Sequence, residues 1–123
     1  MPVGSSRAAG IAAEQQALEY LQQQGLTLLA RNWSCKGGEL DLVMLTGDTV
    51  VFAEVRYRMH ANWGGALGSI DERKRARLIL AAQSFLLAEP QWADSPCRFD
   101  VIALEGMACT ADKVNWLPNA FDC

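Results

Sequence analysis

The sequence predicts an α/β fold in which a mixed β-sheet is flanked by helices, and three observations support this. Half of the 123 residues are hydrophobic and a fifth are charged, so the chain can bury a core. Two stretches have the apolar spacing of helices, and strand-like apolar runs follow each of them. The length fits a single domain spanning residues 1–123, and we find no repeat or linker.

The first helix is predicted over residues 8–24, with Ser5 or Ser6 as the N-cap and Gly25 just beyond its end. Glu14 lies within the apolar stripe of this helix, where an unpaired carboxylate is costly to bury. Glu14 is therefore expected to have a partner. The stripe contains Ile11, Ala17, Leu18 and Leu21.

A short strand (26–31), a glycine-rich turn (32–38) and a β-hairpin follow. The hairpin arms are residues 39–45 and 49–57, joined by the turn Thr46-Gly47-Asp48. Because both arms are rich in Val, Leu and Phe on both faces, we expect them at the centre of the sheet.

The second helix is predicted to begin with a capping box of Ser69 and Glu72 and to run to about Glu89, where Pro90 ends it. Its core face consists of Leu78, Ala81 or Ala82, Phe85 and Leu86. Two further strands are predicted over residues 98–104 and 113–117.

Several protein classes are excluded by composition. No apolar run approaches the roughly 20 residues that span a bilayer, and the first ten residues lack the apolar core of a signal peptide, so we expect a cytoplasmic protein without membrane partners. The single histidine, His60, has no nearby partner, and no cysteines form a CxxC pair, which argues against a zinc site. Free thiols are expected at Cys35, Cys97, Cys109 and Cys123.

Basic residues are concentrated in one part of an otherwise acidic chain of net charge −3. Residues 56–77 contain six basic and two acidic side chains. Such a face can bind a phosphate backbone, although a solvated helix face is an equally ordinary interpretation. The basic residues are Arg56, Arg58, Arg73, Lys74, Arg75 and Arg77.

Two acidic residues stand inside apolar strands, Asp41 between two leucines and Glu54 between Ala53 and Val55. If the hairpin register pairs them, the two carboxylates share one face with Arg56, and a divalent cation between them would relieve their repulsion. The alternative is a structural ion pair of either acid with Arg56 or Arg58.

Other residues have a mainly structural interpretation. Asp100 also lies in an apolar strand, and we expect it to form a salt bridge with Arg98 or another strand residue. Trp33 and Trp116 are expected to pack in or at the rim of the core. Trp63 either stacks on a base or closes a core edge.

The sequence resembles the YraN-like proteins, a family of small, largely uncharacterised bacterial proteins. The resemblance rests on the segments GELDLV, FAEVRYR and RFDVIAL, the basic helix around Lys74 and the ending NWLPNAF. It implies a restriction-endonuclease-like fold of the PD-(D/E)xK superfamily, similar to that of archaeal Holliday-junction resolvases.

The resemblance also implies site residues and a cofactor. Asp41 and Glu54 would bind Mg²⁺ or Mn²⁺, with the backbone carbonyl of Val55 as a third ligand and Glu14 as the helix-borne acid of the resolvase branch. Arg58 matches the arginine that follows the family's E-V-K. Lys74 matches a lysine in the family's second helix, and it would face phosphate. A homodimer is expected by analogy with resolvases, which cut two strands symmetrically.

One departure affects the functional prediction. Arg56 stands where the family pattern has lysine, and arginine stays protonated and cannot act as a base. Arginine can still stabilise phosphoryl charge and orient water. The sequence thus predicts a metal-dependent nuclease for structured or branched DNA, weakened by this change; the alternative is a non-catalytic nucleic-acid-binding or protein-interaction module on the same fold.

Overall fold

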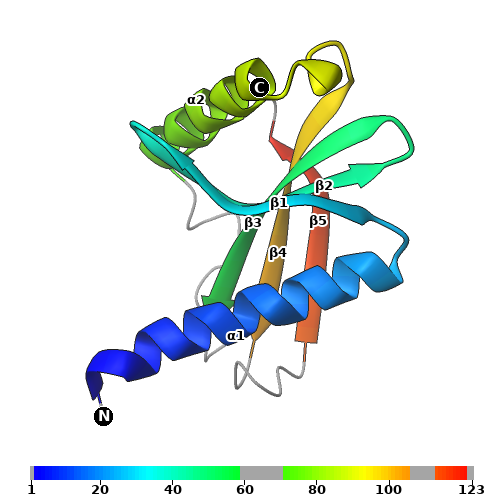
Figure 1. Cartoon of the computed structure of the whole chain (residues 1–123). Helices are drawn as coiled ribbons and strands as arrows, with labels where there is room; N and C mark the ends of the chain where they lie inside the picture. The colour runs from blue at the N-terminus through cyan, green and yellow to red at the C-terminus, as the bar shows by residue number, and fades with distance from the viewer. Residues whose placement is uncertain (1, 59–70, 106–112, 122–123) are drawn as a thin grey trace.

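The protein folds as a five-stranded mixed β-sheet flanked by two helices (Figure 1). The structure is a computed structural model that describes residues 2–58, 71–105 and 113–121. The elements are α1 (Pro2–Gln23), β1 (Thr27–Cys35), β2 (Gly38–Thr46), β3 (Thr49–Arg58), α2 (Glu72–Ala88), the 3₁₀ turn η2 (Pro90–Trp92), β4 (Cys97–Glu105) and β5 (Lys113–Phe121). The α/β fold with a mixed sheet and a central hairpin is confirmed.

The strands lie in the order β1-β2-β3-β4-β5. Only the β3–β4 pair is parallel, and its two strands are connected through α2. The other neighbouring pairs are antiparallel. Since β3 lies in the middle of this order, the acidic hairpin of β2 and β3 is held on both sides by other strands, as predicted.

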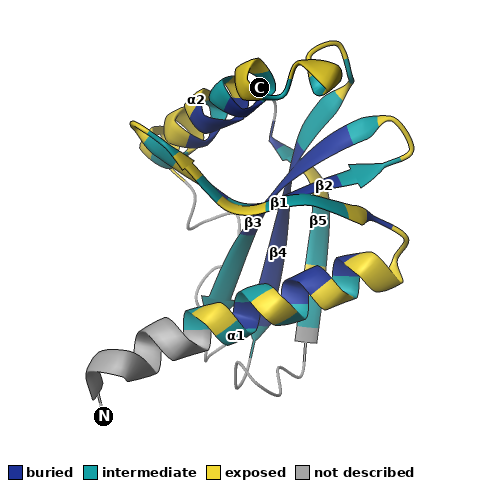
Figure 2. Ribbon diagram, viewed as in Figure 1, coloured by how far each residue is buried: buried dark blue, intermediate teal, exposed yellow. Residues whose placement is uncertain are grey.

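Each face of the sheet is covered by one helix, and alternate residues of β3 show this. Val50 and Phe52 belong to the core cluster that includes α2, whereas Val51 and Ala53 belong to the cluster that includes α1. Successive side chains of a strand point to opposite faces, so the two helices cover opposite faces. Figure 2 shows the corresponding dark, buried stripe along the part of α1 that faces the sheet.

The first helix differs from its prediction at its N-terminal end. It begins at Pro2, so Ser5 and Ser6 lie within the helix and the predicted N-cap is wrong. Ile11 is 56% exposed, although the apolar stripe was predicted to include it. The buried side of the helix instead includes the small residues Ala13 and Ala17, which allow close packing. The buried residues of this helix are Ala13, Ala17, Leu18 and Leu21. Gly25, at φ +97°, follows the helix as predicted.

Strand β1 is longer than predicted and includes most of the segment expected to be a turn. It continues to Cys35, leaving only Lys36 and Gly37 between it and β2. Trp33 packs edge-on against Phe85 of α2, with 5.5 Å between the ring centroids, which explains why the strand continues past the polar Asn32. Asn32 has a φ of +51°, so the strand is irregular at this residue.

The second helix is capped by Asp71, whose carboxylate accepts a hydrogen bond of 2.9 Å from the backbone N–H of Lys74. The predicted cap, Ser69, lies outside the described residues, and the first helical residue is Glu72. The core face is as predicted, with Leu86 partly buried. Within the described part of the chain, no helix is both long and apolar enough to cross a membrane.

The last two strands extend beyond their predicted bounds. In β5 the extension includes Pro118, which has no backbone N–H, and Asn119, with a φ of +52°. The register between β4 and β5 shifts between Phe99 and Val101, opposite this stretch. Strand β5 is therefore irregular along the outer edge of the sheet.

Candidate metal and phosphate site

Asp41 and Glu54 meet where β2 begins to separate from β3. The last recorded pair of the β2–β3 ladder is Leu42 with Ala53, and the same register carried one residue further places Asp41 opposite Glu54. Beyond the ladder, the Asp41 side chain accepts a hydrogen bond of 2.9 Å from the backbone N–H of Val55. The strand register thus fixes the backbone of both acids and one oxygen of Asp41.

The surroundings of Asp41, including Glu54, raise the pKa of the Asp41 carboxyl group. The pKa of Asp41 is raised from its ordinary value of 3.8 to about 8, and burial is the largest cause. The charge of Glu54 and a hydrogen bond with its carboxyl group contribute to this rise, and the hydrogen bond from Val55 opposes it. At pH 7 the pair therefore holds a proton, which a divalent cation could replace.

Glu54 contacts two cationic side chains. It is only 5% exposed, and its Oε2 lies 3.2 Å from the Arg56 guanidinium and 3.1 Å from the Lys74 ammonium. The ion pair with Arg56 is the one that the structural interpretation predicted. Lys74 belongs to α2, the helix that covers this face of the sheet.

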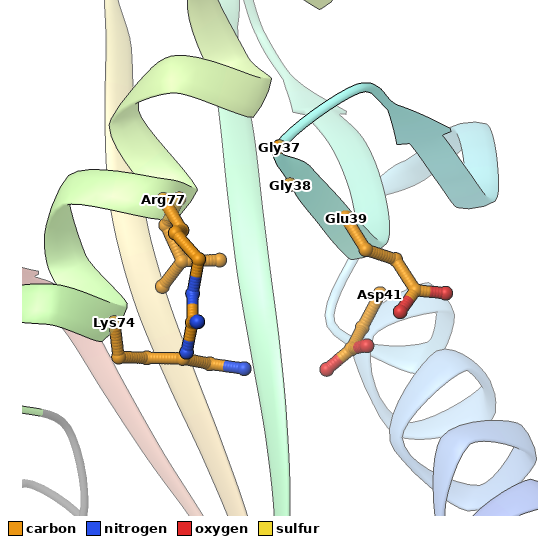
Figure 3. A pocket seen from close by; sticks show the side chains of 7 residues that line it. Gly37, Gly38, Glu39, Asp41, Lys74 and Arg77 are labelled. Atoms are coloured by element: carbon orange, nitrogen blue, oxygen red, sulfur yellow. The ribbon is translucent and has the colours of Figure 1, made fainter.

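A pocket of about 380 Å³ opens beside the acids, between α2 and the turn that joins β1 to β2. Figure 3 shows the Lys74 side chain of α2 extending toward Asp41, with Arg77 on the same side of the pocket as Lys74. The pocket is lined by Gly37, Gly38, Glu39, Asp41, Lys74, Arg77 and Leu78.

Two glycines allow the turn to lie close to α2. Gly37 has a φ of +104°, which L side chains rarely adopt. A Cβ on Gly38 would lie 2.6 Å from the carbonyl oxygen of Arg77, closer than real Cβ atoms come. Glycine at these two positions therefore sets the distance between the acidic and basic walls of the pocket.

The basic residues predicted to bind nucleic acid do not all lie together. Lys74 and Arg77 line the pocket, whereas the guanidinium carbon of Arg75 lies 5.4 Å from the centre of the Phe121 ring at the end of β5. Arg73 is exposed and does not line the pocket. The side chain of Arg58 lies outside the described residues.

Glu14 does not form a three-residue metal-binding group with Asp41 and Glu54 among the described residues. Its charge raises the pKa of Asp41, but this contribution is the smallest of those identified. In residues 2–58, 71–105 and 113–121, no group of three or more His, Cys, Asp and Glu side chains is arranged to hold a metal ion. The donor set that fits a divalent cation is therefore the Asp41–Glu54 pair, whose chemistry suits hard oxygen-seeking ions such as Mg²⁺ and Mn²⁺.

Asp100 has the structural role that the sequence predicts. It is fully buried, and Arg98 donates hydrogen bonds of 3.0 and 3.2 Å to its two carboxylate oxygens. The indole N–H of Trp116 and the backbone N–H of Asn119 each donate a further bond of 2.8 Å. Because both oxygens are fully engaged within the protein, Asp100 is not available to a ligand.

Sequence reasoning missed the contact between Lys74 and Glu54 and the role of Gly37 and Gly38. The sequence predicts only a phosphate contact for Lys74. Glu54 and Lys74 are twenty residues apart, and nothing in this spacing indicates that their side chains are in contact. The paired glycines before the acidic strand were the available signal for a close approach of two backbones. Trp63, His60, Cys109 and Cys123 lie outside the described residues, and Cys35 is a free thiol as predicted.

Comparison of the sequence with known proteins identifies one family. The model of the uncharacterised protein family UPF0102 matches residues 13–104, which include the acidic hairpin, α2 and β4. UPF0102 proteins of Pseudomonas entomophila (strain L48) and Pseudomonas putida (strain GB-1) are each 66% identical over 123 residues, covering the full length of both chains. A UPF0102 protein of Pseudomonas fluorescens (strain Pf-5) is 66% identical over 119 residues, 97% of each chain.

Of the segments that carry the resemblance to YraN-like proteins, those from GELDLV to RFDVIAL lie within the matched range, and the ending NWLPNAF lies beyond it. The match therefore includes both acids of the site and the helix that supplies Lys74 and Arg77. The chain belongs to the uncharacterised protein family UPF0102.

Proposed function

We propose that this protein is a metal-dependent nuclease with a restriction-endonuclease-like fold that hydrolyses phosphodiester bonds in structured or branched DNA. The observation that carries the proposal is the Asp41–Glu54 pair at the edge of a pocket with a basic wall. Hydrolysis of a phosphodiester needs a cation held by carboxylates and positive charge on the phosphate, and both kinds of group are present here.

Asp41 and Glu54 would hold Mg²⁺ or Mn²⁺, with the backbone carbonyl of Val55 as a further oxygen ligand. When bound, the ion would lower the pKa of a coordinated water and stabilise the charge that develops on the phosphate. Glu14 would be the helix-borne acid of the site, and its charge acts on Asp41. These residues and this cofactor follow the assignment that the YraN-like resemblance implies.

Arg56 would stabilise and orient rather than accept a proton, because a guanidinium remains protonated. Its contact with Glu54 supports this role, because an ion bound to Glu54 would then have the guanidinium beside it. Lys74 and Arg77 would contact the phosphate from the opposite wall, and Arg73, Arg75 and Arg58 would guide the rest of the backbone through charge.

The experiment that tests the proposal is a cleavage assay with Mg²⁺ and with Mn²⁺. The substrates are a Holliday junction, a flap, duplex DNA and single-stranded DNA. We expect cutting by the wild type, loss of at least about a hundredfold in Asp41→Asn, and full activity in Asp48→Asn, an exposed turn residue at the other end of the hairpin. Equal cutting by wild type and Asp41→Asn would contradict the assignment.

A second function is favoured by one observation, the contact of Glu54 with two cationic side chains. Together with arginine at position 56, these contacts would suit a module that binds nucleic acid or a protein without cutting. The variant Arg56→Lys separates the two proposals. Cutting by Arg56→Lys alone marks lost catalysis on an intact site, and inactivity of both proteins with salt-sensitive DNA binding supports the binding module.

A further inference from the structure

The pocket has walls of opposite charge, and one residue reaches both. Glu39 and Asp41 line it from β2, and Lys74 and Arg77 line it from α2 (Figure 3). The Lys74 ammonium also lies 3.1 Å from the buried carboxylate of Glu54. With its side chain one-third exposed, Lys74 stands between the acid pair and the solvent-accessible pocket.

We propose that Lys74 exchanges between two partners, Glu54 in the metal-free protein and a substrate phosphate group once a divalent cation is bound, so that metal and phosphate bind cooperatively. This inference rests on the proposed function, because it uses the same pair of carboxylates. It adds the order in which the site is filled and the residue that couples the two ligands.

Charge balance is the first reason for the exchange. A carboxylate as buried as Glu54 needs a neutralising charge, which Lys74 and Arg56 supply. A divalent ion on Asp41 and Glu54 would bring two positive charges to the same oxygens, and repulsion would then disfavour the contacts of both cationic side chains with Glu54. Of these two side chains, Lys74 is the one that lines the pocket and can leave Glu54 for it.

Reach is the second reason. Lysine has a flexible four-carbon stem with a rotatable ammonium, so Lys74 can turn from Glu54 into the pocket without movement of α2. Arg77, one helical turn further along, lies on the same wall and has a planar fork suited to phosphate oxygens. The two residues together form an anion site that is complete only after Lys74 leaves Glu54.

Size and charge indicate the class of ligand. A pocket of about 380 Å³ admits a phosphate group with its attached sugar but not a base-paired duplex. The acidic wall would repel that phosphate without a bound cation. The ligand class is thus a phosphate ester of a nucleotide, either internal to a strand or at its end.

The test measures Mn²⁺ binding to the full-length protein by electron paramagnetic resonance, with and without a phosphate probe. The first probe is thymidylyl-thymidine, which carries one phosphodiester, and the second is thymidine 5′-monophosphate. We expect at least one probe to tighten Mn²⁺ binding about fivefold or more, a usual size for coupled sites, and Mn²⁺ to tighten that probe by the same factor. If the first probe has the larger effect, the pocket binds phosphates within a strand. If the second probe has the larger effect, the pocket binds the phosphate at a strand end.

Four variants identify the residue that couples the ligands. In Lys74→Gln, Mn²⁺ alone should bind more tightly than in wild type because a competing cation is gone, and the effect of the probe should fall below about twofold. Lys74→Arg should keep the effect of the probe. Arg77→Gln should weaken probe binding at every Mn²⁺ concentration, and Arg31→Gln, which removes an exposed arginine of β1 that bonds Gln15 of α1, should match wild type.

The outcomes separate this inference from the proposed function. Undiminished cooperativity in folded Lys74→Gln, or weaker Mn²⁺ binding in that variant, would overturn the exchange while leaving a metal-dependent nuclease in place. Absence of Mn²⁺ binding by wild type would overturn both. If Lys74→Gln does not fold, Lys74→Met takes its place. Loss of cooperativity in folded Lys74→Met supports the exchange, and retained cooperativity in that variant contradicts it. Loss of cooperativity in Lys74→Arg also contradicts the exchange.

Discussion

Asp100 and Asp41 are both aspartates inside apolar strands of one sheet, yet their surroundings differ in kind. Asp100 receives four hydrogen bonds from Arg98, Trp116 and Asn119, and its charge is balanced by a guanidinium. Asp41 receives one backbone hydrogen bond and lies against a second carboxyl group, that of Glu54. The first carboxylate is fully engaged within the protein, whereas at the second site two carboxyl groups lie against each other.

This difference separates the buried acid that has a structural role from the one that we propose binds a ligand. A carboxylate whose oxygens are all engaged stabilises the fold and has little to offer a ligand. A pair of acids that must keep a proton at neutral pH has a position that a cation can take. Burial alone would have ranked Asp100 first, since it is 0% exposed.

The largest effect on stability is expected from Asp100→Ala. The change leaves Arg98, Trp116 and the Asn119 N–H without their buried acceptor, so we expect a loss of about 3–5 kcal/mol in the free energy of unfolding. Urea denaturation measures it. The control is Asp94→Ala, which removes an exposed carboxylate. A loss below about 1 kcal/mol for Asp100→Ala would contradict the structural role.

The second effect is a pH dependence that Asp41→Asn should remove. Because the pKa of Asp41 is raised in the folded protein, its contribution to stability is complete below about pH 4 and is lost as the pH rises through about 8. Relative to Asp41→Asn, the wild type should therefore lose on the order of a few kcal/mol between these pH values.

Urea denaturation of both proteins at several pH values measures this difference. Asn keeps an oxygen that can accept the hydrogen bond from Val55, so the comparison isolates the charge. Asp48→Asn should follow the wild type throughout. A constant difference between wild type and Asp41→Asn from pH 4 to pH 8 would show that the pKa of Asp41 is not raised in the folded protein.

The smallest effect is expected from Gly38→Ala. The added methyl group would meet the Arg77 carbonyl oxygen at 2.6 Å and the Ala81 side chain at 3.0 Å, so the β1–β2 turn and α2 must separate. We expect a loss of about 1–3 kcal/mol, measured by thermal or urea unfolding. Gly10→Ala in α1, where a Cβ meets nothing within 4 Å, should not destabilise.

Patterns local in the sequence predicted most of the fold. The hairpin turn at Gly47 and the apolar arms around it determine the register that brings Asp41 beside Glu54, which is why this half of the site was predictable. The end of the first helix at Gly25 was equally local. The start of that helix was not, because Ser5 and Ser6 are good caps that the helix nevertheless continues through.

The parts that were not predictable depend on contacts distant in sequence. Strand β1 passes through Asn32 because Trp33 packs on a phenylalanine of α2, and no local pattern contains that partner. Lys74 contacts Glu54 because α2 lies across the sheet, a consequence of packing rather than of spacing. Local sequence therefore predicted the acidic half of the site, and tertiary packing supplied the basic half.

The irregular outer strands have a consequence for self-association. Both edges of the sheet contain an interruption: a register shift and Asn32 at positive φ in β1, and Pro118 and Asn119 in β5. An interrupted edge presents no continuous row of backbone donors and acceptors to another strand, which opposes sheet extension and fibril-like stacking. A homodimer of this chain would therefore be built from side chains and helix surfaces, and would leave its sheets separate.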